Sequence, residues 1–409
     1  MSKRRMAAVV LVTAVLIICQ IFPVKAADDE NLYVYALSAV LMDGETGRVL
    51  YGKEAYKGRP NASTTKVMTC ILALELAKGD DYVQVSGNAA SQPQTRLGMR
   101  EGQQFYLEDL LYSLMLKSHN DSAVAIAEHI GGSVEGFAEK MNEKAKELGC
   151  KDTHFVTPNG LDGEDEGGIH HTTARDLALI MAYAIKNATF VHITQTRDYT
   201  FTDISGKKHY SVHNTNAFLD METGVISGKT GFTGNAGYCY VCAVRQDERL
   251  FIVALLGCGW PRNKNYKWSD TKKLLSYGRE NYQYVMLPEL PQLPEIPVIE
   301  AAPGKEDPYP QKSYRSGYPP KQVMLKIHAV LSEKDREKRY LLKKTETITW
   351  ETELPDKLPA PIQKNQKIGT LHAKLNGKEL LSCLVTADDK IDRITYKWYV
   401  DKVFKDYFH

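Results

Sequence analysis

Ser63 and Lys66 are the residues of this chain best suited by type and spacing to covalent chemistry. Residues three apart on a helix share one face, so the lysine amine can reach the serine hydroxyl. An amine in that position can act as the base that turns a hydroxyl into a nucleophile. The same Ser-x-x-Lys spacing also occurs at residues 205–208 and 269–272, so the spacing alone is a weak signal.

Two further motifs follow in order and strengthen the signal: Ser118-His119-Asn120 and Lys229-Thr230-Gly231. Three such motifs in this order are typical of serine β-lactamases and penicillin-binding proteins. We interpret His119 as a loop histidine without a chemical role.

The first motif requires a buried helix with Ser63 at its start. Residues 67–76 are apolar on nearly every side, and Gly79 follows, which is a usual end for a helix. At a helix N-terminus the backbone N–H groups are unpaired and favour developing negative charge. The pattern therefore predicts a central helix that presents Ser63 at its positive end.

Further elements predict a mixed α/β domain. Residues 37–42 and 48–51 read as two strands joined by a hairpin turn, and strand-like segments return at 199–202, 237–244 and 250–257. Helical patterns cover residues 107–116, 122–130, 134–148 and 174–185. Strands at both ends with helices between them imply that the first and last strands share one sheet.

A second, smaller domain is predicted after a proline-rich connector. Nine of the 17 prolines lie between Pro288 and Pro320. Short strand-like runs follow at 323–330, 345–350, 367–370, 371–375 and 380–386, which indicates a small β domain. Residues 391–409 then turn helical, with an imperfect apolar stripe. The two interpretations of this last helix are a membrane-surface anchor and a helix packed on its own domain.

The N-terminus is typical of an exported protein. Lys3-Arg4-Arg5 precede an apolar run that ends near Phe22, and residues 24–26 form a Val-Lys-Ala cleavage site, so we predict a signal peptide over residues 1–26. The alternative is an uncleaved membrane anchor. Without these residues the formal net charge changes from +2 to −2. A nearly neutral chain gives no reason to expect nucleic acid as a partner.

Six cysteines remain after residue 26, too few for a disulfide framework in a chain of this length. Cys239 and Cys242 have the spacing of a redox motif, but they lie in a predicted strand. Residues three apart in a strand point to opposite faces, so we favour two separate, half-buried thiols.

Nearly the whole mature chain resembles the low-molecular-mass, serine-type penicillin-binding D-alanyl-D-alanine carboxypeptidases, a peptidase S11-like family. The three motifs carry the resemblance, together with Thr46-Gly47-Arg48 before them and Ala236-Gly237-Tyr238 after them. It implies an α/β (mixed) fold: a β-lactamase/transpeptidase-like catalytic domain with an antiparallel sheet and helices over residues 27–287. A Pro-rich connector and β-rich C-terminal domain would follow over 288–390, then the helix at 391–409. The implied partners are peptidoglycan stem peptides ending in D-Ala-D-Ala outside the cytoplasmic membrane, and β-lactam antibiotics as covalent inhibitors. No cofactor is implied.

The resemblance also implies roles for the motif residues. Ser63 would attack the penultimate D-alanine, Lys66 would take its proton, and Ser118 would relay a proton to the leaving amine. At the ordinary lysine pKa only about one amine in 2,500 is neutral at pH 7, so burial and a second cation must lower the pKa of Lys66. Lys229, on the strand that faces the helix, is that second cation.

The resemblance implies that the remaining predicted site residues bind substrate. Asn120 would hold a substrate amide, and Phe232 would add its backbone N–H to that of Ser63 as the second oxyanion donor. Gly231 has no side chain, which lets the substrate lie beside the strand as an added strand. Thr230 would bind the terminal carboxylate. The family often places an arginine nearby, but the matching position here is Lys267, which cannot make the two-pronged arginine contact.

Other functions fit the sequence less well. A class A β-lactamase would use a Glu-x-x-x-Asn segment to deacylate, and the acidic loop at 158–166 lacks that pattern. A non-catalytic penicillin-binding sensor would not need Ser63 and Lys66 intact. Endopeptidase cleavage of cross-links is chemically adjacent and stays open. A metal enzyme is disfavoured, because the chain has no His-Glu-x-x-His and the pair His170-His171 precedes a predicted helix cap.

Overall fold

The computed structural model describes residues 32–77, 82–302, 322–397, 400 and 404. The chain forms two compact units. The first consists of the described parts of Met1–Met42, Gly47–Ala243 and Ile252–Thr271, and the second of Asp43–Thr46, Val244–Phe251 and the described part of Lys272–His409. The predicted signal peptide lies outside the described residues.

A five-stranded sheet brings together strands from both ends of the predicted catalytic domain. Its order is β2-β1-β11-β10-β9, so β9 is an edge strand. The strands are β1 (Ser38–Asp43), β2 (Val49–Lys53), β9 (Val225–Thr233), β10 (Gly237–Gln246) and β11 (Arg249–Leu256). Strands β1 and β2 pair antiparallel, as the hairpin pattern predicted. The prediction that the first and last strands share one sheet is confirmed.

The helix predicted after Ser63 is present and buried, but Ser63 itself lies in a different kind of turn. A 3₁₀ turn, η1 (Ala62–Thr65), leads into helix α1 (Lys66–Leu76), and the first eight residues of α1 are buried. No side chain caps the start of α1. A tighter 3₁₀ turn is common at a helix N-terminus. Ser63 therefore precedes the α-helix instead of opening it.

The helix predicted over residues 107–116 is divided in two. Helix α3 (Leu107–Tyr112) passes into a π-helical turn, η2 (Ser113–Lys117), and Ser118 then adopts a left-handed backbone with φ 63°. Helix α4 (Asn120–Gly131) begins two residues later. Single π-helical turns are rare in proteins, and those that occur are often found at functional sites. Here the wider turn ends the first helix just before the Ser118 motif.

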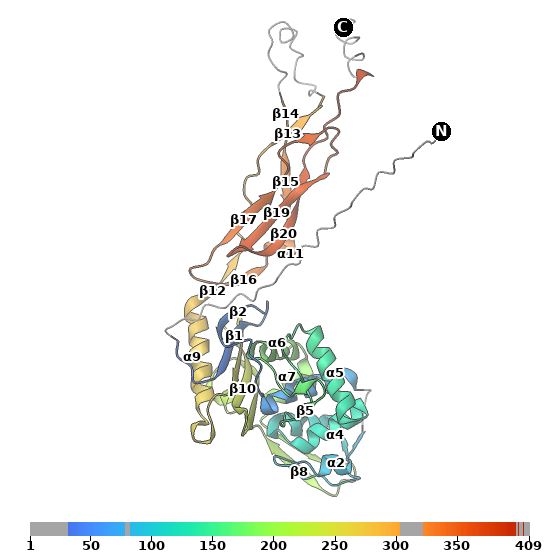
Figure 1. The fold of residues 1–409 in the computed structure, drawn as a ribbon, viewed down its shortest axis with the longest axis vertical. Helices are drawn as coiled ribbons and strands as arrows, with labels where there is room; N and C mark the ends of the chain where they lie inside the picture. The colour runs from blue at the N-terminus through green and yellow to red at the C-terminus, as the bar shows by residue number, and fades with distance from the viewer. Residues whose placement is uncertain (1–31, 78–81, 303–321, 398–399, 401–403, 405–409) are drawn as a thin grey trace, which may run out of the picture. The chain divides into compact units, whose positions relative to one another are not determined.

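Helices α4 to α7 gather on one side of the sheet in Figure 1. They include α5 (Val134–Glu147), α6 (Ala174–Ala184) and α7 (Ala188–Gln195). The first two match predicted helices, whereas α7 was not predicted. The smaller elements of this unit are β3 (Tyr82–Gln84), α2 (Gly87–Ala90), β4 (Gln104–Tyr106), β5 (Glu164–Asp165), β6 (Gly168–Ile169), β7 (Asp198–Thr202), β8 (His209–His213), α8 (Phe218–Met221) and η3 (Pro261–Asn263).

The second unit contains helix α9 (Tyr266–Asn281) from Lys272 onward and the predicted β domain. A four-stranded sheet has the order β15-β20-β19-β17, a three-stranded sheet β14-β13-β18, and a pair joins β12 to β16. The elements are β12 (Tyr282–Met286), β13 (Ile296–Ile299), β14 (Val323–Leu325), β15 (Ile327–Val330), α11 (Glu333–Arg336), β16 (Arg339–Lys343), β17 (Ile348–Glu353), β18 (Leu358–Pro359), β19 (Lys367–Leu375) and β20 (Lys378–Ala387).

Several predicted strands of this unit have different bounds in the structure. Residues 323–330 form two strands in different sheets, and residues 367–375 form one strand instead of two. The predicted C-terminal helix begins later than residue 391, because Ile391 and Arg393 form isolated β-bridges with Ile362 and Ala301. Helical backbone is found at residues 396, 397, 400 and 404. The other residues after 397, and residues 303–321 of the proline-rich region, lie outside the described residues.

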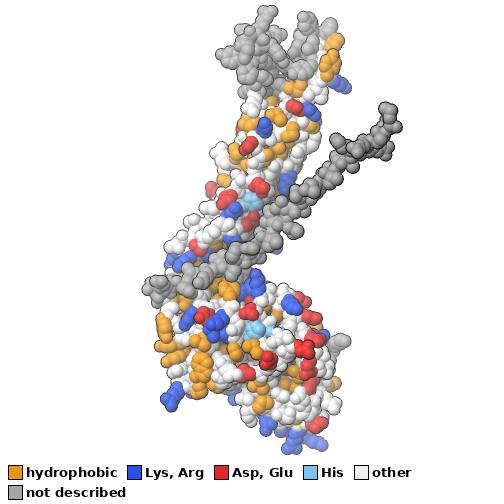
Figure 2. All heavy atoms as spheres, in the orientation of Figure 1, with side chains coloured by type: hydrophobic (Ala, Val, Ile, Leu, Met, Phe, Trp, Pro, Cys, Tyr) orange, Lys and Arg blue, Asp and Glu red, His pale blue; other side chains and the backbone are white. Residues whose placement is uncertain are grey.

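Among the described helices, none is by itself both long and apolar enough to cross a membrane. Helices α6 and α7 pass the length and composition test only as a pair bent by 104°. Figure 2 shows acidic and basic side chains interspersed on the visible face, as expected for a chain with a formal net charge of +2.

Candidate active site

Ser63 and Lys66 form the contact that the first motif predicts. The amine Nζ of Lys66 lies 2.8 Å from the hydroxyl Oγ of Ser63. Ser63 is half-buried, whereas Lys66 is fully buried. The pair therefore has the geometry of a nucleophile and its base.

Two oxygen atoms hold the other side of the Lys66 amine. The side-chain oxygen of Asn120 lies 2.9 Å from Nζ, and the backbone carbonyl of Asn159 lies 2.7 Å from it. Burial lowers the pKa of Lys66 well below its usual value, the charge of Lys229 lowers it further, and Asp121 partly opposes the shift. A buried amine with few opposite charges loses its proton more readily, which is what a base requires.

Lys229 forms a second amine–hydroxyl pair with the second motif. Its Nζ donates to the Ser118 hydroxyl at 2.8 Å and to the Thr230 carbonyl at 2.8 Å. Only 1% of Lys229 is exposed, and burial lowers its pKa to about 7. The amine can therefore exchange a proton with Ser118 near neutral pH.

Strand β9 packs directly against the turn that carries Ser63. A Cβ atom added to Gly231 would lie 2.8 Å from the backbone nitrogen of Ser63 and 3.0 Å from that of Thr64. No real side chain tolerates such distances to the backbone, so glycine is required for this approach. Phe232 follows and is 42% exposed. The backbone N–H groups of Ser63 and Phe232 thus belong to segments in contact.

The acidic loop at 158–166, which we considered from the sequence only as a deacylation segment, completes the surroundings of the Lys66 amine. The carbonyl of Asn159 accepts from Lys66 and lies 3.4 Å from the Ser63 hydroxyl. Gly160 has φ +81°, and an added Cβ there would lie 1.9 Å from the Ala62 carbonyl oxygen. The hydroxyl of Thr69 donates to the Pro158 carbonyl at 2.6 Å. Every residue has a backbone carbonyl, so the residue type could not identify Asn159 as a contact of Lys66.

The Lys267 amine makes a separate set of contacts, one of them to the ring of Tyr238, which packs against Phe232. This amine donates to the Lys264 carbonyl and lies 4.5 Å from the ring centres of both Tyr238 and Trp268. Burial lowers its pKa to about 8. Among the described residues, the contacts of the Lys267 amine include none of the other predicted site residues. Its assignment to carboxylate binding stays a prediction.

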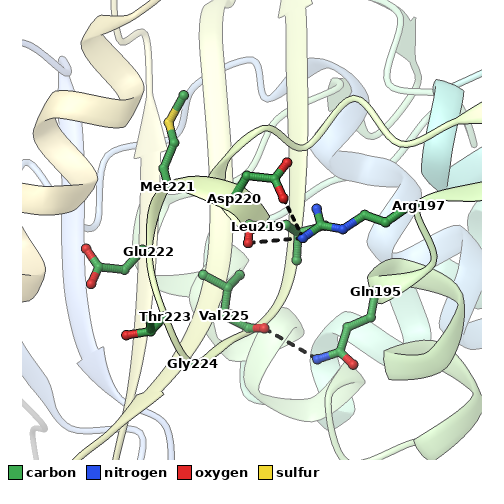
Figure 3. Close-up of a pocket in the computed structure, with 9 residues that line it drawn as sticks. All are labelled: Gln195, Arg197, Leu219, Asp220, Met221, Glu222, Thr223, Gly224 and Val225. Atoms are coloured by element: carbon green, nitrogen blue, oxygen red, sulfur yellow. Dashed lines mark hydrogen bonds and ion pairs between the residues drawn. The ribbon is translucent and has the colours of Figure 1, made fainter.

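An open cavity of about 610 Å³ lies near the start of β9, away from these motifs (Figure 3). Arg197 crosses it, donating to the Leu219 carbonyl at 3.1 Å and pairing with Asp220 at 2.7 Å. Gln195 donates to the Val225 carbonyl at 3.4 Å from the same side as Arg197 (Figure 3). None of the predicted site residues lines this cavity, so cavity size does not locate the chemistry here.

The two cysteines of strand β10 are more buried than predicted. Cys239 and Cys242 both lie in β10, as predicted, but both are fully buried instead of half-buried. Burial raises the pKa of each thiol to about 12, so neither is a reactive thiolate.

These contacts define a class of enzyme: serine acyl-transfer enzymes whose nucleophile is served by a buried lysine, with an edge strand as one wall. Comparison of the chain with known protein families agrees with this class. A model of the D-alanyl-D-alanine carboxypeptidase family matches residues 24–258, and a model of the penicillin-binding protein 5 C-terminal domain matches residues 340–393. The chain belongs to the D-alanyl-D-alanine carboxypeptidase family.

Similarity to individual relatives extends over most of the chain. The carboxypeptidase DacF of Bacillus subtilis is 31% identical over 380 residues, which is 91% of this chain and 90% of that protein. DacA of Escherichia coli is 28% identical, covering 93% of this chain and 91% of that protein. The structure of penicillin-binding protein 5 from Haemophilus influenzae is 26% identical with a TM-score of 0.63, covering 88% of this chain and 99% of that chain.

Proposed function

We propose that this protein is a serine-type D-Ala-D-Ala carboxypeptidase. It would remove the terminal D-alanine from peptidoglycan stem pentapeptides through an acyl-enzyme on Ser63. The observation that supports this most is the pair of buried amines, each 2.8 Å from a serine hydroxyl: Lys66 at Ser63 and Lys229 at Ser118.

Acylation needs a bond between Ser63 Oγ and the carbonyl carbon of the penultimate D-alanine. The hydroxyl proton passes to the Lys66 amine as that bond forms, while Asn120 and the Asn159 carbonyl hold the amine in place. The developing oxyanion would accept from the backbone N–H groups of Ser63 and Phe232, and one such donor is typically worth about 3–4 kcal/mol.

Release of D-alanine needs a proton on the leaving nitrogen. Ser118 would supply it as the C–N bond breaks and take another from Lys229, whose pKa of about 7 suits both giving and accepting a proton. Water then bonds to the acyl carbon and the bond to Ser63 breaks. Ser63 recovers the proton held on Lys66, and the proton from water returns to Lys229 through Ser118, which closes the cycle.

Substrate recognition is proposed along the edge strand. The stem peptide would lie beside β9 at Gly231, with a backbone amide held by Asn120. Thr230 would bind the terminal carboxylate, and Lys267 is the cation proposed for the same carboxylate. Because lysine makes a single-point contact, we expect this recognition to be weaker than with arginine.

The place of action is proposed from the predicted terminal segments. Residues 1–26 would direct export, and the helical segment that begins at Tyr396 would hold the enzyme at the outer face of the cytoplasmic membrane or in the cell wall. The stripe Tyr396, Val400, Val403 and Tyr407, with lysines elsewhere around the helix, is the feature that supports membrane contact.

Release of D-alanine from a synthetic peptide ending in D-Ala-D-Ala tests the function. We expect steady release by the wild type and a fall of at least about 10⁴-fold for Ser63→Ala, because the nucleophile is essential to the covalent route. A wild type that binds penicillin but releases no D-alanine would instead support a sensor.

A further inference from the structure

His170 joins two segments that meet at the Lys66 amine: the turn that ends at Thr65 and the loop that leads to Asn159. It is 4% exposed and precedes α6, outside the three motifs. Its ring packs edge-on against Phe155, with ring centres 5.6 Å apart. From the sequence we interpreted His170 only as part of a histidine pair before a helix cap, without a chemical role.

The hydrogen bonds of the ring assign its tautomer. Nδ1 faces the backbone N–H groups of Val156 at 3.1 Å and Thr157 at 3.3 Å, and both can only donate. Nδ1 is therefore the unprotonated acceptor, and Nε2 carries the hydrogen. That hydrogen points to the Thr65 hydroxyl, 2.8 Å away. The ring is thus neutral and bonded at both nitrogens.

Each end of this bridge lies within two residues of a group at the proposed active site. Thr65 immediately precedes Lys66 in the turn that carries Ser63, and its hydroxyl also accepts from Asn61 at 2.8 Å. On the other side, Thr157 is two residues before Asn159, whose carbonyl lies 2.7 Å from the Lys66 amine. One imidazole therefore ties the turn that carries the base to the loop that holds its amine.

We propose that His170 is a positioning residue, which sets the distance between the Lys66 amine and the Asn159 carbonyl and so keeps the base aligned on Ser63. This inference rests on the proposed function. A misplacement of about 1 Å far from the chemistry can cost about 10²-fold in rate. Loss of the ring would leave two part-buried backbone N–H groups without their acceptor, and the loop can then move to find another.

Two conservative variants separate the two ends of the bridge. His170→Asn places an amide oxygen where Nδ1 lies and keeps the loop's acceptor, whereas His170→Gln places an amide nitrogen where Nε2 lies and keeps the donor to Thr65. Thr65→Val removes the hydroxyl on the other side, and Thr65→Ser keeps it. His171→Gln is the matched control, because His171 is adjacent in sequence but its ring bonds Asp152 and the Ile169 carbonyl at the surface.

The measurement is the rate of penicillin acylation, with kcat and KM for D-alanine release and the Tm of each variant. We expect both His170 variants and Thr65→Val to lose at least about tenfold in acylation rate and kcat, with KM changed less than about twofold. Thr65→Ser should restore the rate to within about threefold of wild type, and His171→Gln should match wild type.

Wild-type acylation rates in folded His170 variants would overturn the proposal, as would equal losses in Thr65→Ser and Thr65→Val. If the His170 variants do not fold, the two Thr65 variants decide alone. A wild type that is never acylated would contradict the proposed function instead, so the two failures are distinguishable.

Discussion

Two buried lysines dominate the electrostatics of the site at the scale of single residues. Lys66 and Lys229 are 0% and 1% exposed, and the charge of Lys229 is one cause of the lowered pKa of Lys66. Burying an amine that prefers to be charged costs stability. Asp121 opposes the shift at Lys66 only in part. The burial therefore lowers stability, and it also gives a base that loses its proton more readily than an exposed lysine.

The first prediction concerns this cost. Lys229→Met should be more stable than the wild type at pH 7 and should lose most acylation. The folded pKa of Lys229, about 7, lies below its unfolded value of 10.5, so the unfolded state binds more protons between these values. Wild-type stability therefore rises with pH from 7 to 10.5, and the advantage of the variant is greatest below pH 7.

Urea unfolding at pH 7 and pH 9.5 measures this advantage. The free energy of unfolding of Lys229→Met should exceed that of the wild type by more at pH 7 than at pH 9.5. An equal or smaller difference at pH 7 would show that the amine is not buried in the way described.

The second prediction is the pH dependence of acylation. Because Lys66 must be neutral to accept a proton and its pKa is lowered well below 10.5, the acylation rate should rise with pH and level off well below 10.5. Removing the charge of Lys229 should raise the pKa of Lys66 and move the profile of Lys229→Met to higher pH. Stopped-flow acylation by a chromogenic β-lactam from pH 5 to 10 tests this, and an unshifted midpoint would contradict it.

At the scale of elements, the site depends on the contact between β9 and the turn η1. The third prediction is that Gly231→Ala lowers acylation by at least about 10²-fold and destabilises the fold by about 1–3 kcal/mol, because the added Cβ would lie 2.8 Å from the Ser63 nitrogen. Gly234→Ala is the matched control, since nothing lies within 4 Å of its added Cβ. Equal effects of the two changes on acylation would contradict the account.

Much of this arrangement could be predicted from the sequence, and the exceptions have physical reasons. Strands β1 and β2 and helix α1 follow local patterns of apolar residues, and the three motifs supply most of the side chains at the site. The 3₁₀ turn at Ser63 and the π turn before Ser118 were missed, because both have residues compatible with an α-helix and their geometry is decided by packing. Asn159 contacts Lys66 through its backbone carbonyl, and the buried ring of His170 links Thr65 to the loop before Asn159. The spacing of motifs in the sequence reveals neither contact.

At the scale of the whole molecule, the chain combines an α/β unit with a β-rich unit that matches the penicillin-binding protein 5 C-terminal domain. The fourth prediction concerns the segment after this domain. The chain without residues 1–26 should sediment with vesicles that contain anionic lipid, and a further truncation after residue 395 should abolish sedimentation without changing acylation. No sedimentation of the longer chain would favour a last helix packed on its own domain.

The most direct test of the central claim is the intact mass of the protein after incubation with benzylpenicillin, followed by mapping of the modified peptide. The account predicts one covalent adduct per chain, located on Ser63 and absent from Ser63→Ala, with slow formation in Lys66→Met. An adduct on another residue, or one that persists in Ser63→Ala, would contradict it.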